Sequence, residues 1–160
     1  MIIRSATESD AAAIWAIIEP VIRAGETLTL GREMSEAAAL AYWFDADKEV
    51  FVAEEGGAIL GTYYLRANQT GGGARVANAG YVTGAAAVGR GVARAMGLHS
   101  IAHAKARGFR AMQFNFVVST NVRAVGLWQS LGFEVVGRLP GAFDHPAEGF
   151  VDALVMFRAL

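Results

Sequence analysis

The most restrictive feature of this sequence is a strand that leads through a glycine-bearing turn directly into a helix, within residues 75–96. Strand-like residues extend to Thr83, a bend of small residues follows, and a helical pattern begins after Gly91. Unpaired N–H groups at a helix start, together with the helix dipole, suit a phosphate or pyrophosphate group. Gly89 and Gly91 carry no Cβ, so a ligand could approach their backbone closely. The turn predicts either an anion-binding site or, as is more common for two glycines before a helix, a simple tight turn.

Two common phosphate-binding motifs do not fit this turn. The Gly-x-x-x-x-Gly-Lys-Ser/Thr pattern of nucleoside triphosphate sites is absent. The dinucleotide fingerprint needs a third glycine, and Arg94 stands at its place. The turn therefore points away from both classes of nucleotide-binding protein.

Length and composition limit the class of protein. The chain has 160 residues, enough for a hydrophobic core, and we expect one domain over residues 1–160. It is 54% apolar and 18% charged, as in a globular protein, and its net charge of −1 offers no broad basic surface for nucleic acid. The absence of cysteine excludes disulfides, thiolate metal sites and a cysteine nucleophile. No apolar run is long enough to span a membrane, and Arg4 follows Met1 too soon for a signal peptide, so we expect a cytoplasmic protein.

Hydrophobic periodicity and turn residues predict alternating strands and helices. Strands are expected at 2–4, 49–54, 58–66, 75–83, 112–118, 133–139 and 150–157, and helices at 12–22, 35–44, 91–107 and 121–131. Loops are expected at 25–34 and between the last two strands, at 140–149. The order β-α-α-β-β-β-α-β-α-β-β favours one mixed α/β sheet.

Residue types predict finer details of these elements. Thr7 followed by Asp10 suggests a capping-box start for the first helix. Gly56 and Gly57 mark a hairpin turn. The buried face of the second helix is expected to hold Ala37, Leu40, Ala41 and Phe44.

A second motif extends from Asn121 to Phe133. Asn121 stands at a helix start, where asparagine is a good N-cap, and Gly132 ends the helix. Together the two motifs resemble those of the GNAT acyltransferases, which transfer acyl groups from acyl-coenzyme A to amines. Residues 88–93 resemble the family's Gln/Arg-x-x-Gly-x-Gly/Ala pyrophosphate loop. Residues 121–133 resemble its Asn-x-x-Ala-x-x-Leu-Tyr-x-x-x-Gly-Phe helix.

This resemblance implies the GNAT fold, a mixed and mostly antiparallel sheet of about seven strands flanked by four helices. It also implies acetyl-CoA as cosubstrate. The edge of strand 80–83, including Val82 and Thr83, would pair with the pantetheine arm, and Asn121 would hydrogen-bond the cofactor near Trp128. The pyrophosphate would bind the backbone N–H groups of Val88, Gly89, Arg90, Gly91, Val92 and Ala93.

Two departures from the family pattern affect the expected chemistry. Val88 replaces the loop's Gln or Arg, so one side-chain contact is lost; Arg90 and Arg94 either supply charge there or are solvated helix residues. Trp128 replaces a tyrosine that in many members is the proposed acid for the leaving thiolate. An indole N–H donates hydrogen bonds but is no useful acid, so Trp128 packs in the core or against the acyl chain. The thiolate then needs no protein acid, or Tyr81 serves.

Within the family, the chain is most similar to proline-analogue N-acetyltransferases that acetylate azetidine-2-carboxylate. Asn78, Asn115 and Asn121 carry this likeness, together with the segments 139–146 and 151–153. The likeness implies that Asn78 holds the substrate carboxylate and that Asn115 stabilises the tetrahedral intermediate. Independently, asparagine is disfavoured in strands and costly when buried unpaired, so Asn78 and Asn115 indicate either a site or structural hydrogen bonds.

The sequence leaves the general base open. Glu26, Asp144 and His145 are candidates, and each is otherwise a surface or loop residue; a backbone carbonyl or a water chain is the alternative. His99 and His103 lie four residues apart on the predicted long helix, but no third ligand accompanies them. We therefore expect no metal site.

We expect an N-acetyltransferase that moves an acetyl group from acetyl-CoA to the amine of a small amino-acid-like molecule. Direct attack is favoured because the chain has no cysteine and no serine in a nucleophile elbow. One alternative is a GNAT enzyme acting on a protein N-terminus or lysine, which would need an open groove with acidic side chains. Loops 25–34 and 140–148 favour a small substrate instead. The other alternative is a CoA-binding module without activity.

We expect neither nucleic acid nor a membrane as a partner. A homodimer is one interpretation of an apolar face, and core packing is the other. That face would consist of Phe143, Phe150 and Phe157.

Overall fold

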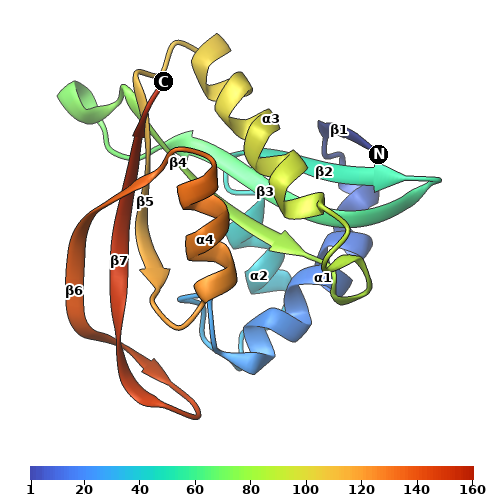
Figure 1. The fold of residues 1–160 in the computed structure, drawn as a ribbon. Helices are drawn as coiled ribbons and strands as arrows, with labels where there is room; N and C mark the ends of the chain where they lie inside the picture. Colours follow the sequence, from blue (N-terminus) through green and yellow to red (C-terminus); the bar gives the residue numbers. More distant parts are fainter.

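The computed structural model describes residues 1–160 and contains one sheet of seven strands, in the order β1-β2-β3-β4-β5-β7-β6, with four helices (Figure 1). The strands are β1 (Ile2–Ser5), β2 (Glu49–Glu55), β3 (Ala58–Ala67), β4 (Val76–Thr83), β5 (Ala111–Val118), β6 (Glu134–His145) and β7 (Gly149–Ala159). The helices are α1 (Ala11–Ala24), α2 (Glu36–Trp43), α3 (Val92–Ala106) and α4 (Val122–Ser130). Short 3₁₀ turns lie at Glu8–Asp10, Gly71–Gly73 and Ala85–Ala87. The predicted mixed, mostly antiparallel sheet flanked by four helices is confirmed.

The sheet splits between its two central strands. β4 and β5 are the one parallel pair, and they are in register only at Val76↔Ala111 and Ala77↔Met112. Beyond these two rungs the strands diverge, and in Figure 1 helix α4 lies over the point where they separate. Each strand therefore has a backbone edge with no partner strand on the side of the split.

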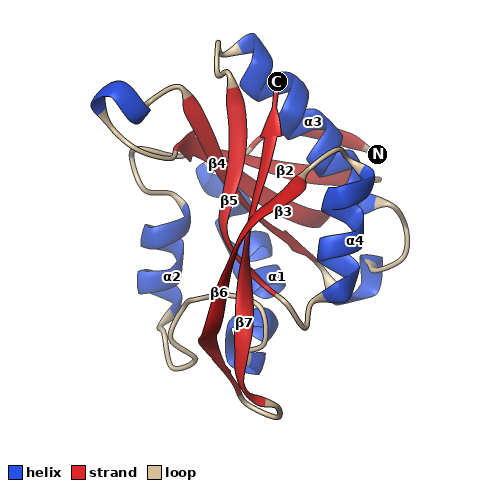
Figure 2. Ribbon diagram, turned by 60° about the vertical axis from the view of Figure 1, so that its left-hand side comes forward, coloured by secondary structure: helices blue, strands red, loops and turns tan.

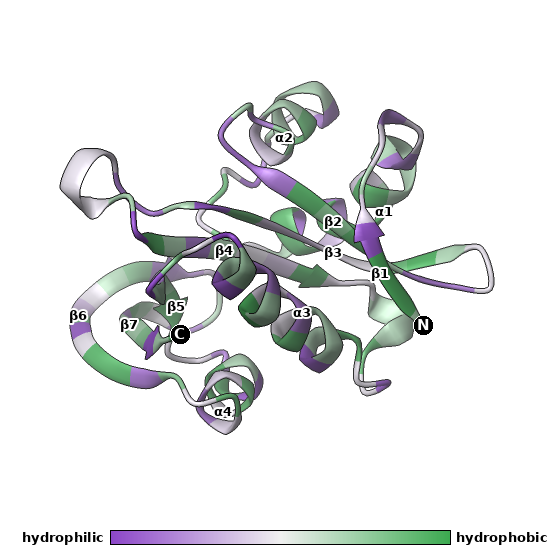
Figure 3. Cartoon of the chain, turned by 90° about the horizontal axis from the view of Figure 1, so that it is seen from above, coloured by the Kyte–Doolittle hydropathy of each residue, from purple (hydrophilic) through white to green (hydrophobic).

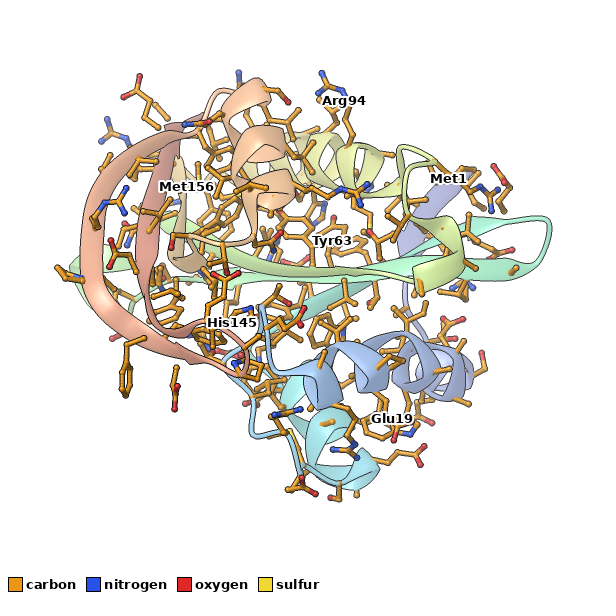
Figure 4. The ribbon with its side chains drawn as sticks, turned by 60° about the horizontal axis from the view of Figure 1, so that its bottom comes forward. Met1, Glu19, Tyr63, Arg94, His145 and Met156 are labelled. Carbon is orange, nitrogen blue, oxygen red and sulfur yellow. The ribbon has the colours of Figure 1, made fainter.

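Helices cover both faces of the sheet. α1 and α2 lie on one face, and α3 and α4 lie on the other (Figure 3). Alternate residues of a strand point to opposite faces, so β3 is buried on both sides. Tyr63 and Leu65 join the core under α3 and α4, whereas Tyr64 joins the core under α1 and α2. The position of Tyr63 between the sheet and the helices is visible in Figure 4.

Helix α2 buries a different face from the one predicted. Ala39 and Trp43 are buried, whereas Ala37 and Ala41 are exposed. Trp43 sets the rotation of the helix, because its bulky ring is 1% exposed and its indole N–H donates to Thr62 Oγ1 at 3.1 Å. The aromatic ring and its one polar atom thus outweigh the spacing of the smaller apolar residues.

The predicted loop at 140–149 is wrong. β6 continues to His145 and β7 begins at Gly149, so the two strands form a long twisted hairpin (Figure 2). Only three residues connect the strands. This end of the chain is therefore strand pairing rather than a flexible cover.

A break in the β6–β7 register accommodates the proline and glycine that suggested a loop. The register shifts between Leu139 and Phe143, around Pro140 and Gly141. Gly141 has a φ of 57° and its N–H donates to Asp152 Oδ1 at 2.9 Å, so a side chain of β7 replaces the missing backbone partner. Such bulges let a strand continue past residues that cannot join the ladder.

The three phenylalanines predicted to share an apolar face do not do so. Phe150 is 77% exposed, Phe143 is buried, and Phe157 is partly buried. They therefore give no common surface for a second subunit.

The capping box and the β2–β3 hairpin turn are confirmed. Thr7 N–H donates to Asp10 Oδ2 at 2.8 Å, and Gly56 and Gly57 have φ values of 59° and 81°. None of the helices combines the length and apolarity that crossing a bilayer requires.

Candidate active site

A cavity of about 300 Å³ is lined by residues from both sides of the split between β4 and β5. The loop 27–30 after α1 and the start of α4 approach it from opposite faces of the sheet. Two ligands, one bound on each face of the sheet, could therefore meet in this cavity. Its polar and aromatic lining consists of Thr27, Thr29, Tyr42, Trp43, Tyr64, Arg66, Asn78, Tyr81, Phe114, Asn115, Phe116, Asn121 and Trp128.

The β4 edge at the cavity carries free backbone groups. Val76 O accepts from Asn68 N–H, and the N–H of Gly84, just after β4, donates to Leu60 O. The even-numbered residues of β4 therefore hydrogen-bond to β3. Antiparallel pairing alternates, so Ala79, Tyr81 and Thr83 direct their N–H and C=O groups toward β5, where no strand pairs with them. These residues present donors and acceptors to whatever enters the split.

Val82 and Thr83 were both expected to pair with the pantetheine arm, but their backbone groups point in opposite directions. Thr83 directs its backbone into the split. The backbone of Val82 bonds to β3, and its side chain is 4% exposed in the core under α1 and α2. Tyr81 and Thr83, rather than Val82 and Thr83, are therefore the residues whose backbone groups point into the split.

The turn before α3 leaves several N–H groups open. Gly89 and Gly91 have φ values of 84° and 79°, which favour glycine, and a Cβ at either position would meet nothing within 4 Å. The first hydrogen bond into the helix runs from Ala95 N–H to Gly91 O at 3.0 Å. The N–H groups of Val92 and Ala93 thus have no acceptor in the helix. This arrangement suits an anion.

The side chains around this turn are engaged by the protein. Arg90 forms an ion pair with Glu55, and Arg94 Nη1 donates to Ser130 Oγ at 3.0 Å. Val88 is half exposed. The backbone, rather than these side chains, provides the open donors.

Asn121 and Trp128 both border the cavity, and both also have a structural contact. Asn121 is the N-cap of α4, and its Oδ1 accepts from Ala124 N–H at 3.3 Å. Trp128 is buried, with ring centroids 4.7 Å from Tyr81 and 4.8 Å from Phe114. The N-cap leaves the amide nitrogen of Asn121 free to donate, and the indole of Trp128 forms part of an aromatic wall.

The Tyr81 ring borders the cavity, but its hydroxyl points toward α3. Ser100 Oγ donates to Gly97 O at 2.8 Å, so the Tyr81 hydroxyl, 2.7 Å from Ser100 Oγ, must be the donor in that pair. Burial raises the pKa of Tyr81 well above its ordinary value. The phenol is therefore neutral and already donates a hydrogen bond.

Asn78 and Asn115 lie at the opening of the split, and both are hydrogen-bonded. Asn78 Nδ2 donates to Gln113 O at 3.0 Å, across the point where β4 and β5 separate. Asn115 Nδ2 donates to Asn68 Oδ1 at 2.6 Å, and Asn115 Oδ1 accepts from Gln113 Nε2 at 2.9 Å. A register shift between Phe114 and Val117 re-aims this part of β5. Asn78 thus has one structural partner and Asn115 has two, and both amides border the cavity.

None of the candidate bases reaches the cavity. Glu26, Asp144 and His145 are absent from its lining, which contains no carboxylate and no imidazole. His145 Nδ1 accepts the N–H groups of Ala147 and Glu148, both at 3.2 Å, and so shapes the β6–β7 turn (Figure 4). The structure thus offers no protein side chain as an evident base.

The two helix histidines serve other contacts. His99 Nδ1 lies 2.7 Å from the Tyr63 hydroxyl, and His103 Nε2 lies 2.9 Å from Glu49 Oε2. No three Asp, Glu, His or Cys side chains gather to hold a metal ion.

Sequence reasoning missed the contribution of β3 to the cavity. Tyr64 and Arg66 line it from the face under α1 and α2. The signal was present, because the alternation that turns Tyr63 and Leu65 to one face turns Tyr64 and Arg66 to the other.

Comparisons with known proteins agree on a family. The model of the acetyltransferase (GNAT) family matches residues 15–133. The N-acetyltransferase aca1 of Schizosaccharomyces pombe is 29% identical over 98 residues, which are 61% of this chain and 47% of that protein. The chain thus spans about half the length of this curated relative.

Solved structures match over nearly the whole chain. A GCN5-related N-acetyltransferase from Kribbella flavida has 42% identity and a TM-score of 0.94, with 99% of this chain and 97% of that chain covered. The structure of yncA from Salmonella typhimurium with its cofactor acetyl-CoA has 26% identity and a TM-score of 0.87, with coverage of 100% and 94%.

Proposed function

The chain belongs to the acetyltransferase (GNAT) family, whose members are acetyl-CoA-dependent N-acetyltransferases, and we propose on this basis that it transfers an acetyl group from acetyl-CoA to the amine of a small, amino-acid-like substrate by direct attack. The observation that carries this proposal is the cavity through the split. The cavity joins the edge of β4, with its free backbone groups, to a small compartment with polar and apolar walls on the opposite face of the sheet.

The protein groups around the split suit acetyl-CoA. The open N–H groups of Val92 and Ala93 would hold the pyrophosphate, and the free edge at Tyr81 and Thr83 would hold the pantetheine arm. Asn121 has a free amide nitrogen beside this path. Acetyl-CoA supplies an activated acetyl thioester there. A solved neighbour, yncA, contains acetyl-CoA, which supports this assignment.

Catalysis would rest on orientation and on polarisation of the reacting carbonyl. Strand N–H groups that point into the split are fixed before reaction, so they can stabilise negative charge that develops on an oxygen there. Asn115 would add a side-chain N–H to the same opening, and Asn78 would hold the two strands at the correct separation through Gln113. Tyr81 would contribute its ring as a wall, since its hydroxyl donates to Ser100.

The compartment under α1 and α2 supports a small substrate. About 300 Å³ is at the lower end of the usual range for ligand cavities, and the transferred acetyl group takes part of that space. Leu28, Leu30 and the ring of Tyr64 give it apolar walls, and the amides of Asn78 and Asn115 give it polar ones. A cyclic amino acid such as azetidine-2-carboxylate fits this mixture. A protein substrate would favour acidic side chains, and none lines the cavity.

The test is thiol release from acetyl-CoA against azetidine-2-carboxylate, proline analogues, common amino acids and a lysine peptide. Thermal stabilisation by CoA is measured in parallel. Turnover of a small cyclic amino acid, with none of the peptide, is the expected result. Stabilisation by CoA with turnover of the peptide alone would overturn the substrate class. If CoA neither stabilises the protein nor supports turnover, the proposed acetyl-CoA-dependent activity is wrong.

A further inference from the structure

Arg66 is a guanidinium at the cavity wall with unused donors. It lies near the end of β3, and its Nη1 donates to Asp47 Oδ2 at 3.0 Å. Its Nε–H is buried and donates to no group of the protein. Every other buried side-chain nitrogen or oxygen has a hydrogen-bond partner. A buried donor without a protein acceptor is costly, so a water or a ligand in the cavity is left to supply the acceptor for this N–H.

Arg66 is also the one charged residue in the lining of the cavity. The side chains of Arg66 and Asp47 are 33% and 53% exposed, so solvent screens that ion pair, whereas the buried Nε of Arg66 is screened less. Because the lining holds this positive group and no acid, the compartment has a preference for anions. The same property disfavours a substrate that offers only a cationic amine.

The geometry of the guanidinium specifies the kind of anion. Asp47 occupies Nη1, which leaves the edge formed by Nε and Nη2. Two parallel N–H groups on one edge match the two oxygens of a carboxylate. A small turn of the guanidinium that uncovers Nε would let a carboxylate on this edge give Nε the acceptor that the protein does not provide.

The position of Arg66 relates this edge to the reacting centre. Arg66 is the register partner of Asn78 on β4, and the two side chains lie on the same face of the sheet. The next residue of β4, Ala79, begins the free backbone edge in the split. An acid group held beside Asn78 therefore places an adjacent amine at the opening to the other face.

We propose that Arg66 binds the substrate carboxylate and thereby restricts the enzyme to amines that carry a carboxylate beside the nitrogen. This inference rests on the proposed function. It reassigns the carboxylate contact that the sequence suggested for Asn78, because one N–H of that amide donates to Gln113 O. Asn78 then helps to orient the acid, and Arg66 supplies the charge.

The first experiment measures binding without turnover. Isothermal titration calorimetry on the CoA-saturated protein compares cyclobutanecarboxylate, which has the ring and the acid but no amine, with cyclobutanecarboxamide. The wild type should bind the acid at least tenfold more tightly than the amide, and Arg66→Met should lose that preference. Equal affinities in the wild type, or an unchanged preference in Arg66→Met, would overturn the assignment.

Asp47→Asn is the matched control. It removes the same ion pair but leaves the guanidinium, so it should retain the preference for the acid. Loss of the preference in Asp47→Asn as well would mean that the ion pair, rather than Arg66, builds the site. Thermal unfolding and CoA affinity of each variant establish that the fold and the other face of the cavity are intact.

The second experiment measures turnover of azetidine-2-carboxylate and of azetidine, which lacks the acid. Arg66→Met should lower kcat/KM for the acid about 100-fold and should not lower the value for azetidine, which the positive charge disfavours; Arg66→Lys should recover part of the loss for the acid. If the wild type acetylates neither compound but binds cyclobutanecarboxylate through Arg66, the proposed substrate is wrong and the carboxylate site stands. If it acetylates both equally, the inference fails and the proposed activity stands.

Discussion

The ring of Tyr64 lies directly over the α-carbon of Gly80 on the neighbouring strand, where a Cβ would come within 2.7 Å of the ring atoms Cε1 and Cζ. The two residues are register partners in β3 and β4. Trp43 packs edge-on against the ring at a centroid distance of 5.0 Å, and the Tyr42 hydroxyl lies 3.3 Å from that of Tyr64. The ring is thus held from several sides, and glycine at position 80 makes room for it.

Gly80→Ala should therefore displace Tyr64 and disturb the substrate compartment. We expect a loss of about 1–3 kcal/mol in the free energy of unfolding, as for overpacked cores, and about a tenfold higher KM for the amine. The KM for acetyl-CoA should change little. Denaturant unfolding and steady-state kinetics measure both effects.

Gly126→Ala is the matched control for that variant. Gly126 lies inside α4, and a Cβ there meets nothing within 4 Å. Replacing it should leave kinetics unchanged and stabilise the protein by up to about 1 kcal/mol, because alanine is the better helix former. Wild-type kinetics in Gly80→Ala would show that Tyr64 does not shape the compartment.

The sequence was sufficient to predict the elements near the split because their signals are local. The turn at Gly89 and Gly91 and the N-cap at Asn121 each depend on a few adjacent residues, and the structure contains all of them. Strand periodicity likewise predicted β3 and β4, whose side chains alternate between two cores. Residues adjacent in the sequence determine these features, so they could be predicted without knowing which distant residues contact them.

The errors came from contacts between distant parts of the chain. The hairpin at 140–149 depends on Asp152 accepting the Gly141 N–H, and the rotation of α2 depends on Trp43 donating to Thr62. Alternation along β3 predicts the face on which Arg66 lies, but its proposed role depends on which residues of two other elements surround it. No local pattern contains that information, so these features required the structure.

The turn before α3 should affect acetyl-CoA rather than the amine. In Gly91→Ala, the left-handed φ of 79° strains the alanine, and the turn shifts its open N–H groups. We expect the KM for acetyl-CoA to rise about tenfold with little change in kcat, as one or two hydrogen bonds to a charged group are lost. Initial rates at varied acetyl-CoA measure this.

Gly149→Ala separates strain from binding. Gly149 has a φ of 73° and also has open space around it, but it lies at the β6–β7 turn. It should lose stability like Gly91→Ala and keep the wild-type KM for acetyl-CoA. An equal rise in KM for both variants would attribute the effect to general destabilisation.

Asn115→Ala should act mainly on the chemical step. If its amide stabilises charge in the reaction, kcat should fall about 100-fold, with a smaller rise in the KM for acetyl-CoA. Asn68→Ala removes the acceptor that holds Asn115 Nδ2 at 2.6 Å, so it should lower kcat by less. A higher KM for acetyl-CoA at unchanged kcat would make Asn115 a cofactor-binding residue instead.

Asp10 should stabilise the fold down to strongly acidic pH. Arg4 donates to both carboxylate oxygens at 2.8 and 2.9 Å, which lowers the pKa of Asp10 below its ordinary value. A lowered folded-state pKa contributes stability above the unfolded pKa, near 4, and loses it as pH falls toward the folded value. Asp10→Asn should therefore cost about 2 kcal/mol at pH 7, with the difference shrinking below about pH 4.

The exposed pair of Glu19 with Arg23 provides the comparison for Asp10. Its atoms are 3.5 Å apart and its side chains are about 40% exposed, at 42% and 39%. Glu19→Gln should change the free energy of unfolding by less than about 0.5 kcal/mol at any pH. A pH-independent effect of Asp10→Asn would assign its role to capping of the Thr7 N–H rather than to charge.

The pH dependence of turnover should follow the substrate amine. The cavity contains no carboxylate or imidazole, and burial raises the pKa of Tyr64 and of Tyr81 well above the ordinary value of a phenol. Both phenols therefore stay protonated to about pH 10, and neither titrates as a base below it. kcat/KM should rise with pH as the free amine loses its proton and then level off without a descending limb.

Comparing two substrates whose amines have different pKa values distinguishes ionisation of the substrate from ionisation of an enzyme group. Azetidine-2-carboxylate and an analogue whose amine is more acidic should give rising limbs displaced by the difference between their amine pKa values. His145→Gln should leave both profiles unchanged, because His145 Nδ1 accepts the N–H groups of Ala147 and Glu148 in the β6–β7 turn. A rising limb at the same pH for both substrates would instead reveal an ionising group of the enzyme. The direct-attack mechanism would then need a general base that the cavity lining does not contain.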